Sequence, residues 1–182
     1  MVFLLCASAT EAFDGNRAGF VLGGGAGIAP LVYWSEDPGG DSYQGVGAGF
    51  GFMIGYGWNR NNLLVWEMDL AALNHEFERS YETCMQGYAG PSWYRYFGRP
   101  GRAAFLAVGL GLQQFLYRAD YFEDDCSSTE AGGCVRLGAG YEFARHFQVT
   151  LSWSNGLTYG GPPYRNDYAH STLNVLVSVV GY

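Results

Sequence analysis

Five charged residues lie on segments that otherwise alternate between apolar and small side chains. They are Glu67, Asp69, Arg95, Arg136 and Glu142. Carboxylates and guanidiniums that share one face can form a network of ion pairs, and charges removed from water need such partners. Around a narrow channel, the network would form a gated or narrow ion path. In an interior filled by side chains it would be a structural plug, which is the favoured interpretation.

A second group of acids falls between the apolar segments. It consists of Glu36, Asp37, Asp41, Glu123, Asp124 and Asp125. Carboxylates suit calcium or magnesium, but no segment has the ligand spacing of an EF-hand. A solvated acidic surface is therefore favoured, and we predict no metal site and no cofactor.

Two cysteines, Cys126 and Cys134, flank a short segment rich in serine and glycine. In an oxidising compartment a disulfide between them would close this loop. Cys84 is the odd cysteine once a leader containing Cys6 is removed, and it could instead pair with a loop cysteine. We prefer Cys126–Cys134. No CxxC pair or Cys/His cluster indicates zinc.

The elements that must position these groups are best seen at residues 45–58. Val46, Ala48, Phe50 and every second residue up to Trp58 are apolar, whereas the other parity is glycine except for Met53. Alternate side chains of a strand point to opposite faces, so this strand has one apolar face and one nearly bare face. A soluble sheet normally has polar side chains on its second face. The pattern therefore favours a strand with lipid outside and a crowded barrel lumen inside.

Eight such strands are predicted, joined alternately by short turns and longer connections, as in an up-and-down barrel. The chain of 182 residues is long enough for one domain and contains no lysine. No apolar run approaches the roughly 18–20 residues of a transmembrane helix, so a membrane-spanning fold would have to be a closed barrel. The expected strands are residues 18–33, 45–58, 63–74, 84–97, 103–118, 134–144, 148–159 and 169–182.

Charge separates the two mouths of the predicted barrel. The longer connections, counted with Arg118 at their edge, hold twelve acids and three arginines, whereas the short turns hold four arginines and no acid. The net charge of -7 makes nucleic acid an unsuitable partner.

Residues 1–12 have the short apolar stretch and small residues of a partial signal peptide, which leaves residues 13–182 as the barrel domain.

These features resemble the small eight-stranded outer-membrane barrels of the OmpA/OmpX type. The resemblance implies an all-β, eight-stranded antiparallel transmembrane barrel in the bacterial outer membrane, with periplasmic turns and surface loops. It also implies lipopolysaccharide, outer-membrane lipid and the barrel-assembly machinery as partners.

The chain ends on Tyr182, as members often end on an aromatic residue. Tyr182, Val180 and Leu176 compete with Leu173, Val175, Val177 and Val179 for the apolar face, which leaves the register of this strand open. A soluble lipocalin-type barrel, with its apolar face inside, is the main alternative.

A weaker resemblance connects residues 152–155, Ser-Trp-Ser-Asn, with the lipid A deacylase barrels. Those enzymes have a His-x-Ser-Asn arrangement, because a serine nucleophile needs a hydrogen-bonded base. Here Ser152 replaces the histidine, and only His170 on the next strand could substitute for it. We therefore predict a non-enzymatic barrel for envelope integrity or surface interaction. A lipid A-modifying enzyme and a narrow pore are the alternatives.

Overall fold

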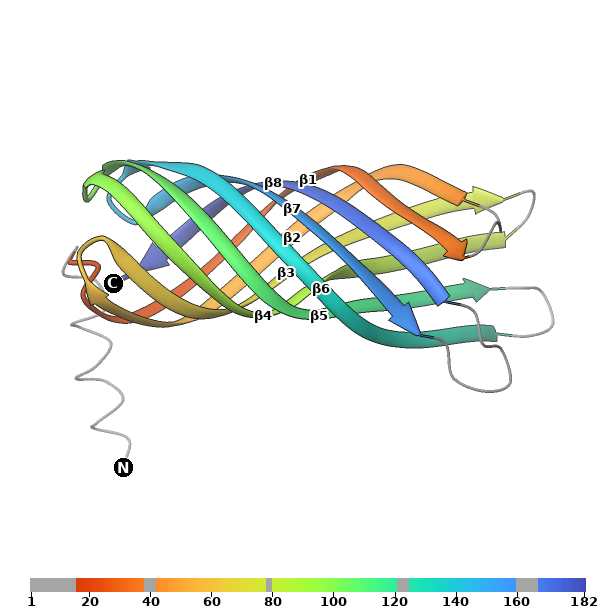
Figure 1. The fold of residues 1–182 in the computed structure, drawn as a ribbon. Helices are drawn as coiled ribbons and strands as arrows, with labels where there is room; N and C mark the ends of the chain where they lie inside the picture. Colours follow the sequence, from red (N-terminus) through yellow and green to blue (C-terminus); the bar gives the residue numbers. More distant parts are fainter. Residues whose placement is uncertain (1–15, 38–41, 78–79, 121–124, 160–166) are drawn as a thin grey trace, which may run out of the picture.

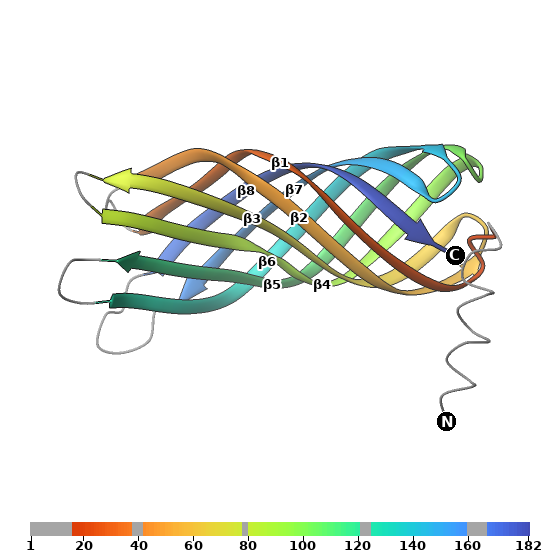
Figure 2. The same ribbon diagram turned by 180° about the vertical axis from the view of Figure 1, so that it is seen from behind.

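The computed structural model describes residues 16–37, 42–77, 80–120, 125–159 and 167–182. These segments form eight antiparallel strands in sequence order, and β1 pairs with β8 to close a barrel (Figures 1 and 2). The C-terminus lies at the end with the short turns. No described helix is long and apolar enough to cross a membrane. The strands are β1 (Gly19–Asp37), β2 (Ser42–Asn59), β3 (Asn62–Phe77), β4 (Ser80–Arg99), β5 (Arg102–Asp120), β6 (Asp125–Ala144), β7 (Phe147–Tyr159) and β8 (Asp167–Gly181).

The strands reach further than predicted at the end opposite the short turns, here called the loop end. The segment 119–133 was expected to be a loop, but β6 already begins at Asp125, and Asp125 pairs with Asp120 of β5. Polar composition suggested a loop there, whereas antiparallel neighbours continue to satisfy each other's backbone groups well beyond the apolar band. Glu36, Asp37 and Asp125 consequently lie on strands. Asp41, Glu123 and Asp124 fall outside the described residues.

The apolar parity of each strand faces outward. Val46 and Leu110 are each 67% exposed, and the large side chains Leu64, Trp66 and Leu137 are about half exposed. Such a continuous apolar wall suits lipid rather than water, because soluble proteins rarely expose apolar patches of this extent. The lipocalin-type alternative, with its apolar face inside, is therefore wrong for this chain.

Glycines on the inward parity make room for larger side chains from opposite strands. A Cβ on Gly49 or Gly51 would lie less than 3 Å from Leu176 of β8. Leu176, Val180 and Tyr182 are all buried, while Val177 and Val179 are exposed. This settles the register of β8: its even-numbered residues fill the lumen and its odd-numbered residues face lipid.

Two apolar clusters occupy the lumen at different heights. The turn-end cluster includes Leu63, Tyr94, Tyr96, Phe105 and Tyr182 and sits next to the short turns. The loop-end cluster includes Val32, Trp34, Leu73, Cys84 and Phe115. Between the two clusters the inward positions are mostly polar, and these positions hold three of the charged residues predicted from the sequence, Glu67, Asp69 and Arg136.

Candidate functional site

The central lumen contains an ion triad formed by Glu67, Asp69 and Arg136. Strands β3 and β6 place the three side chains, which are 4%, 2% and 1% exposed. Arg136 Nη2 lies 2.9 Å from Glu67 Oε1, and Arg136 Nε donates to Asp69 Oδ2 at 3.1 Å. The single guanidinium thus balances the charge of one of the two carboxylates. The remaining negative charge has to be stabilised by hydrogen bonds from neutral donors.

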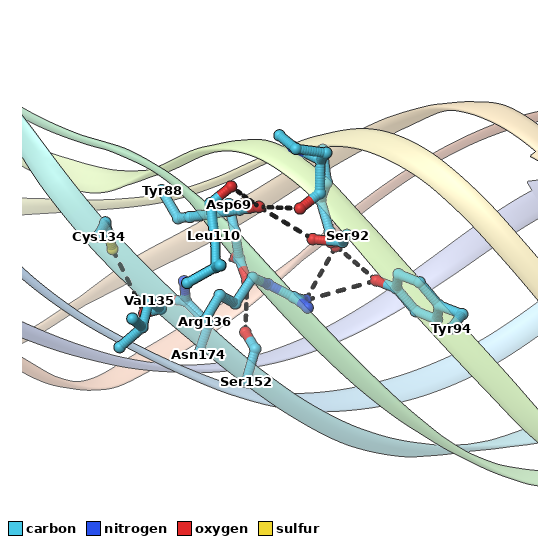
Figure 3. Close-up of polar contacts among 12 residues, drawn as sticks. Asp69, Tyr88, Ser92, Tyr94, Leu110, Cys134, Val135, Arg136, Ser152 and Asn174 are labelled. Atoms are coloured by element: carbon cyan, nitrogen blue, oxygen red, sulfur yellow. Dashed lines mark hydrogen bonds and ion pairs between the residues drawn. The ribbon is translucent and has the colours of Figure 1, made fainter.

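Neutral side chains from three other strands complete the triad (Figure 3). Tyr94 donates its hydroxyl proton to Glu67 Oε1 at 2.6 Å. Asn174 donates to Asp69 Oδ1 at 2.8 Å, and the Ser152 hydroxyl donates to Asp69 Oδ2. Several charge-assisted hydrogen bonds therefore offset the cost of burying the excess carboxylate. Such a network holds five strands in one arrangement.

A small cavity of about 10 Å³ adjoins the triad. Glu67, Arg136, Thr150 and Ser178 contribute to its lining. Glu67 Oε2 and Arg136 Nη1 have no hydrogen-bond partner among the described residues. This volume suffices for about one water molecule, which would have two to four polar partners here. The cavity has the size of a water site and is too small for a solute path.

Glu142 does not join the triad, contrary to the prediction of one network. It lies at the turn end, where Arg17 Nε donates to Glu142 Oε2 at 2.9 Å and Gly101 N–H donates to Glu142 Oε1. The Arg17 guanidinium also lies 4.1 Å from the centre of the Tyr96 ring and 5.9 Å from that of Tyr182. Glu142 is separated from the triad because it stands six residues below Arg136 on one strand, about 20 Å along the chain.

Arg17 is the lumen residue that the sequence prediction missed. It was placed just before the first predicted strand and outside the lumen, yet its side chain is fully buried at the turn-end mouth. Its Nη1 also donates to the carbonyl oxygen of Arg60 in the β2–β3 turn at 3.0 Å. The available signal was charge balance: Glu142 on an inward position needed a cation, and Arg17 directly precedes the first strand.

Arg95 was predicted to point into the lumen, and this is wrong. Its neighbours Tyr94 and Tyr96 are buried in the lumen, so the alternation of β4 turns Arg95 outward beside Trp93 and Phe97. The apolar character of both parities made β4 ambiguous in sequence. Tyrosine hydroxyls can be satisfied inside, so two tyrosines rather than the arginine fill the lumen.

The loop end contains a second polar group around His170. Its Nε2 lies 2.8 Å from Thr158 Oγ1, and its Nδ1 lies 3.0 Å from Gln86 Oε1. Gln86 also donates to Thr172 Oγ1 at 2.7 Å. His170 therefore has two polar partners, and Ser154 is neither of them. This arrangement differs from the nucleophile–base pair that the deacylase alternative requires.

The predicted Cys126–Cys134 disulfide is wrong. Both residues lie on β6, and eight residues of strand separate their Cα atoms by about 26 Å. A disulfide needs Cα atoms within about 7 Å of each other. Cys134 and Cys84 are both buried free thiols, which also removes the alternative pairing of Cys84. The error follows from taking a strand for a loop.

No cluster of three or more metal-ligating side chains occurs among the residues with described placement. The acids of the loop end that lie on described strands are distributed over β1, β3, β4, β5, β6 and β8. Two cross-strand pairs set aspartate opposite aspartate: Asp37 with Asp167, and Asp120 with Asp125.

Comparison with known proteins gives one family and several similar folds. The family described as outer membrane protein beta-barrel domain matches residues 1–180. A search of curated proteins finds no match. Ail, the attachment invasion locus protein of Yersinia pestis, was solved in complex with the heparin analogue sucrose octasulfate. It is 12% identical with a TM-score of 0.60, covering 88% of this chain and 99% of Ail. Neisserial surface protein A is 15% identical with a TM-score of 0.57, covering 89% and 97%.

Proposed function

The chain belongs to the family of outer membrane protein β-barrel domains, and we propose that it is a non-enzymatic member that offers an acidic rim to ligands at the cell surface. It is a protein of the bacterial outer membrane. The observation that carries the proposal is the contrast between a filled lumen and a charged loop end. A narrow pore would need an open path through the lumen, and a lipid A-modifying enzyme would need a serine that lipid can reach. Burial of the described lumen side chains argues against both.

The filled lumen argues against the pore alternative. The turn-end cluster, the ion triad and the loop-end cluster follow one another along the barrel, and the described side chains at each level are buried. Eight strands enclose an interior just wide enough for side chains. Arg17 adds a buried ion pair across the turn-end mouth.

We expect planar bilayers containing the refolded protein to show no discrete conductance steps. The expectation follows from the packing of aromatic side chains at the turn end, where the ring centroids of Tyr96 and Phe105 lie 5.0 Å apart. A general porin recorded in the same bilayer is the positive control. Reproducible steps that disappear when the protein is omitted would contradict the filled lumen.

Restricted access to the serines, as well as the missing base, argues against the enzyme alternative. Ser152 and Ser154 are 2% and 4% exposed and point into the lumen, while Trp153 between them faces lipid. A lipid substrate in the membrane would meet Trp153 and neither serine. Ser152 instead donates to Asp69, which gives it a structural role.

The rim is defined here by the strand ends at the loop end, which carry the aspartate pairs Asp37–Asp167 and Asp120–Asp125. The loop end is rich in acids, whereas the charged residues of the short turns are all arginines. A rim of net negative charge attracts cations, which supports a basic peptide or protein segment as the ligand class. The sulfated ligand in the Ail complex is an anion, so its charge is opposite to that of such a basic segment. We propose that this chain binds polycations and does not bind sulfated polyanions.

Replacing both aspartates of each pair with asparagine is expected to weaken binding of a fluorescent octalysine peptide at least several-fold. Fluorescence anisotropy in zwitterionic micelles measures the affinity, which should fall steeply as salt is raised. Arg99→Gln, at the turn end, is the control. It makes the net charge more negative, so tighter binding by this variant would indicate net charge rather than the rim as the cause.

The same rim suggests how the barrel contributes to envelope integrity. We propose that divalent cations bridge its carboxylates to lipopolysaccharide phosphates, since carboxylates and phosphates share a preference for hard cations. Delivery to the membrane would require the barrel-assembly machinery.

A further inference from the structure

The outer wall of the barrel contains a groove with a volume of about 600 Å³. Small residues, Ala107, Gly138 and Ala139, form part of its lining, and Trp93 and Trp153 contribute large rings. The groove spans strands from β4 to β8. Its volume is typical of a site for a small ligand, and its lining is predominantly apolar.

The cross-strand register explains why the wall is hollow there. Ala139 on β6 pairs with Leu106 on one side and with Leu151 on the other. A methyl group therefore lies between two leucines on the lipid-facing surface. Lipid rather than water contacts this wall, so a hydrocarbon chain is the natural occupant of the depression.

One charged residue, Arg95, lines the groove. It donates from Nη1 to Asn62 Oδ1 at 3.1 Å, and its guanidinium carbon lies 5.9 Å from the centre of the Phe97 ring. Within the described part of the chain it has no carboxylate partner. A guanidinium has five N–H donors, so most of them remain available to an anion. Arginine is well suited to phosphate because its planar fork can bind two oxygens at once.

Other cations gather at the same end of the barrel. Arg99 and Arg102 face each other across the β4–β5 turn. A Cβ on Gly101 in that turn would lie 3.2 Å from the backbone nitrogen of Arg145, so the β6–β7 turn is directly adjacent. The short turns contain no acid. The field at this end of the groove is therefore positive and favours an anionic headgroup.

We propose that the groove binds one anionic glycerophospholipid of the periplasmic leaflet. Its phosphate contacts Arg95, and one acyl chain lies over Ala139 between Leu106 and Leu151. Trp93 and Trp153 contact the chain from the sides. This site is separate from the rim and does not depend on the proposed surface ligand.

Native mass spectrometry of the folded protein in neutral detergent tests the proposal. Phosphatidylglycerol and diacylglycerol with identical acyl chains are added in equal amounts, so the two lipids differ in the phosphate headgroup that Arg95 would contact. The protein should retain one phosphatidylglycerol in about tenfold preference, which is the range expected of a charge-assisted contact. Arg95→Gln should reduce that preference to near one. Ala139→Trp, which fills the groove without changing charge, should reduce retention of both lipids.

Two matched variants separate the site from general effects. Arg60→Gln removes a charge from the β2–β3 turn, which does not border the groove, and Ala48→Trp adds the same bulk on β2. Both variants should retain phosphatidylglycerol like the unchanged protein. The proposal is overturned by undiminished preference in Arg95→Gln or by an equal loss in Arg60→Gln. A protein dimer that Ala139→Trp dissociates would also overturn it, because a second copy would then occupy the groove. Heat-dependent gel mobility verifies that each variant is folded.

Discussion

Replacing Arg136 with methionine is expected to destabilise the barrel by about 3–5 kcal/mol, the range measured when one partner of a buried ion pair is removed. Glu67 and Asp69 would then lie together in the lumen without their cation. Tyr94, Ser152 and Asn174 would still donate hydrogen bonds, but neutral donors do not compensate two adjacent carboxylates. The midpoint of urea unfolding in micelles, followed by tryptophan fluorescence, measures the loss.

A combined variant distinguishes a structural triad from a functional one. Arg136→Met with Glu67→Gln and Asp69→Asn removes all three charges while nearly conserving volume, and it should recover most of the lost stability. Replacing a whole buried ion cluster is often neutral, whereas breaking it is costly. A combined variant as unstable as Arg136→Met alone would show that packing around Arg136, rather than charge, holds the strands.

For most strands, the sequence was enough to predict which parity faces outward, because the outer face contacts lipid and the inner face packs in a crowded lumen. In β2 the outward face is large and apolar and the inward face is glycine, so only one orientation is compatible with lipid outside and Leu176 inside. β4 and β8 lack this contrast. In β4, Tyr94 and Tyr96 alternate with Trp93, Arg95 and Phe97, and both sets could face lipid. Only the hydroxyl partners of Tyr94 and Tyr96, on other strands, decide the orientation.

Pairing of charges was the part of the site that sequence could not determine. Inward positions were predicted for Glu67, Asp69, Arg136 and Glu142, and all four are buried. Which carboxylate meets which guanidinium depends on strand stagger, a property of the closed barrel that no local pattern contains. Stagger brings Arg136 to β3 and leaves Glu142 for Arg17.

Substituting Gly27 with valine is expected to prevent closure of most molecules into a barrel. Gly27 lies on β1 opposite Leu176 of β8, at the seam that converts the sheet into a cylinder. A Cβ at this position would lie 2.0 Å from the Val175 carbonyl oxygen and 3.1 Å from the Leu176 Cα, and both are backbone atoms that a rotamer change cannot move. The seam would have to separate, which exposes strand edges that lipid does not tolerate.

Gly24→Val is the matched control on the same strand. Gly24 faces outward, and the nearest atom to its added Cβ would be the Gly51 carbonyl oxygen at 3.6 Å, an ordinary contact. The fraction of protein that resists SDS before heating should fall several-fold for Gly27→Val and remain unchanged for Gly24→Val. Equal folded fractions would show that the β1–β8 seam can shift to accept a side chain. In that case the stagger of the barrel is set elsewhere, and the ion triad between β3 and β6 is the next candidate for fixing it.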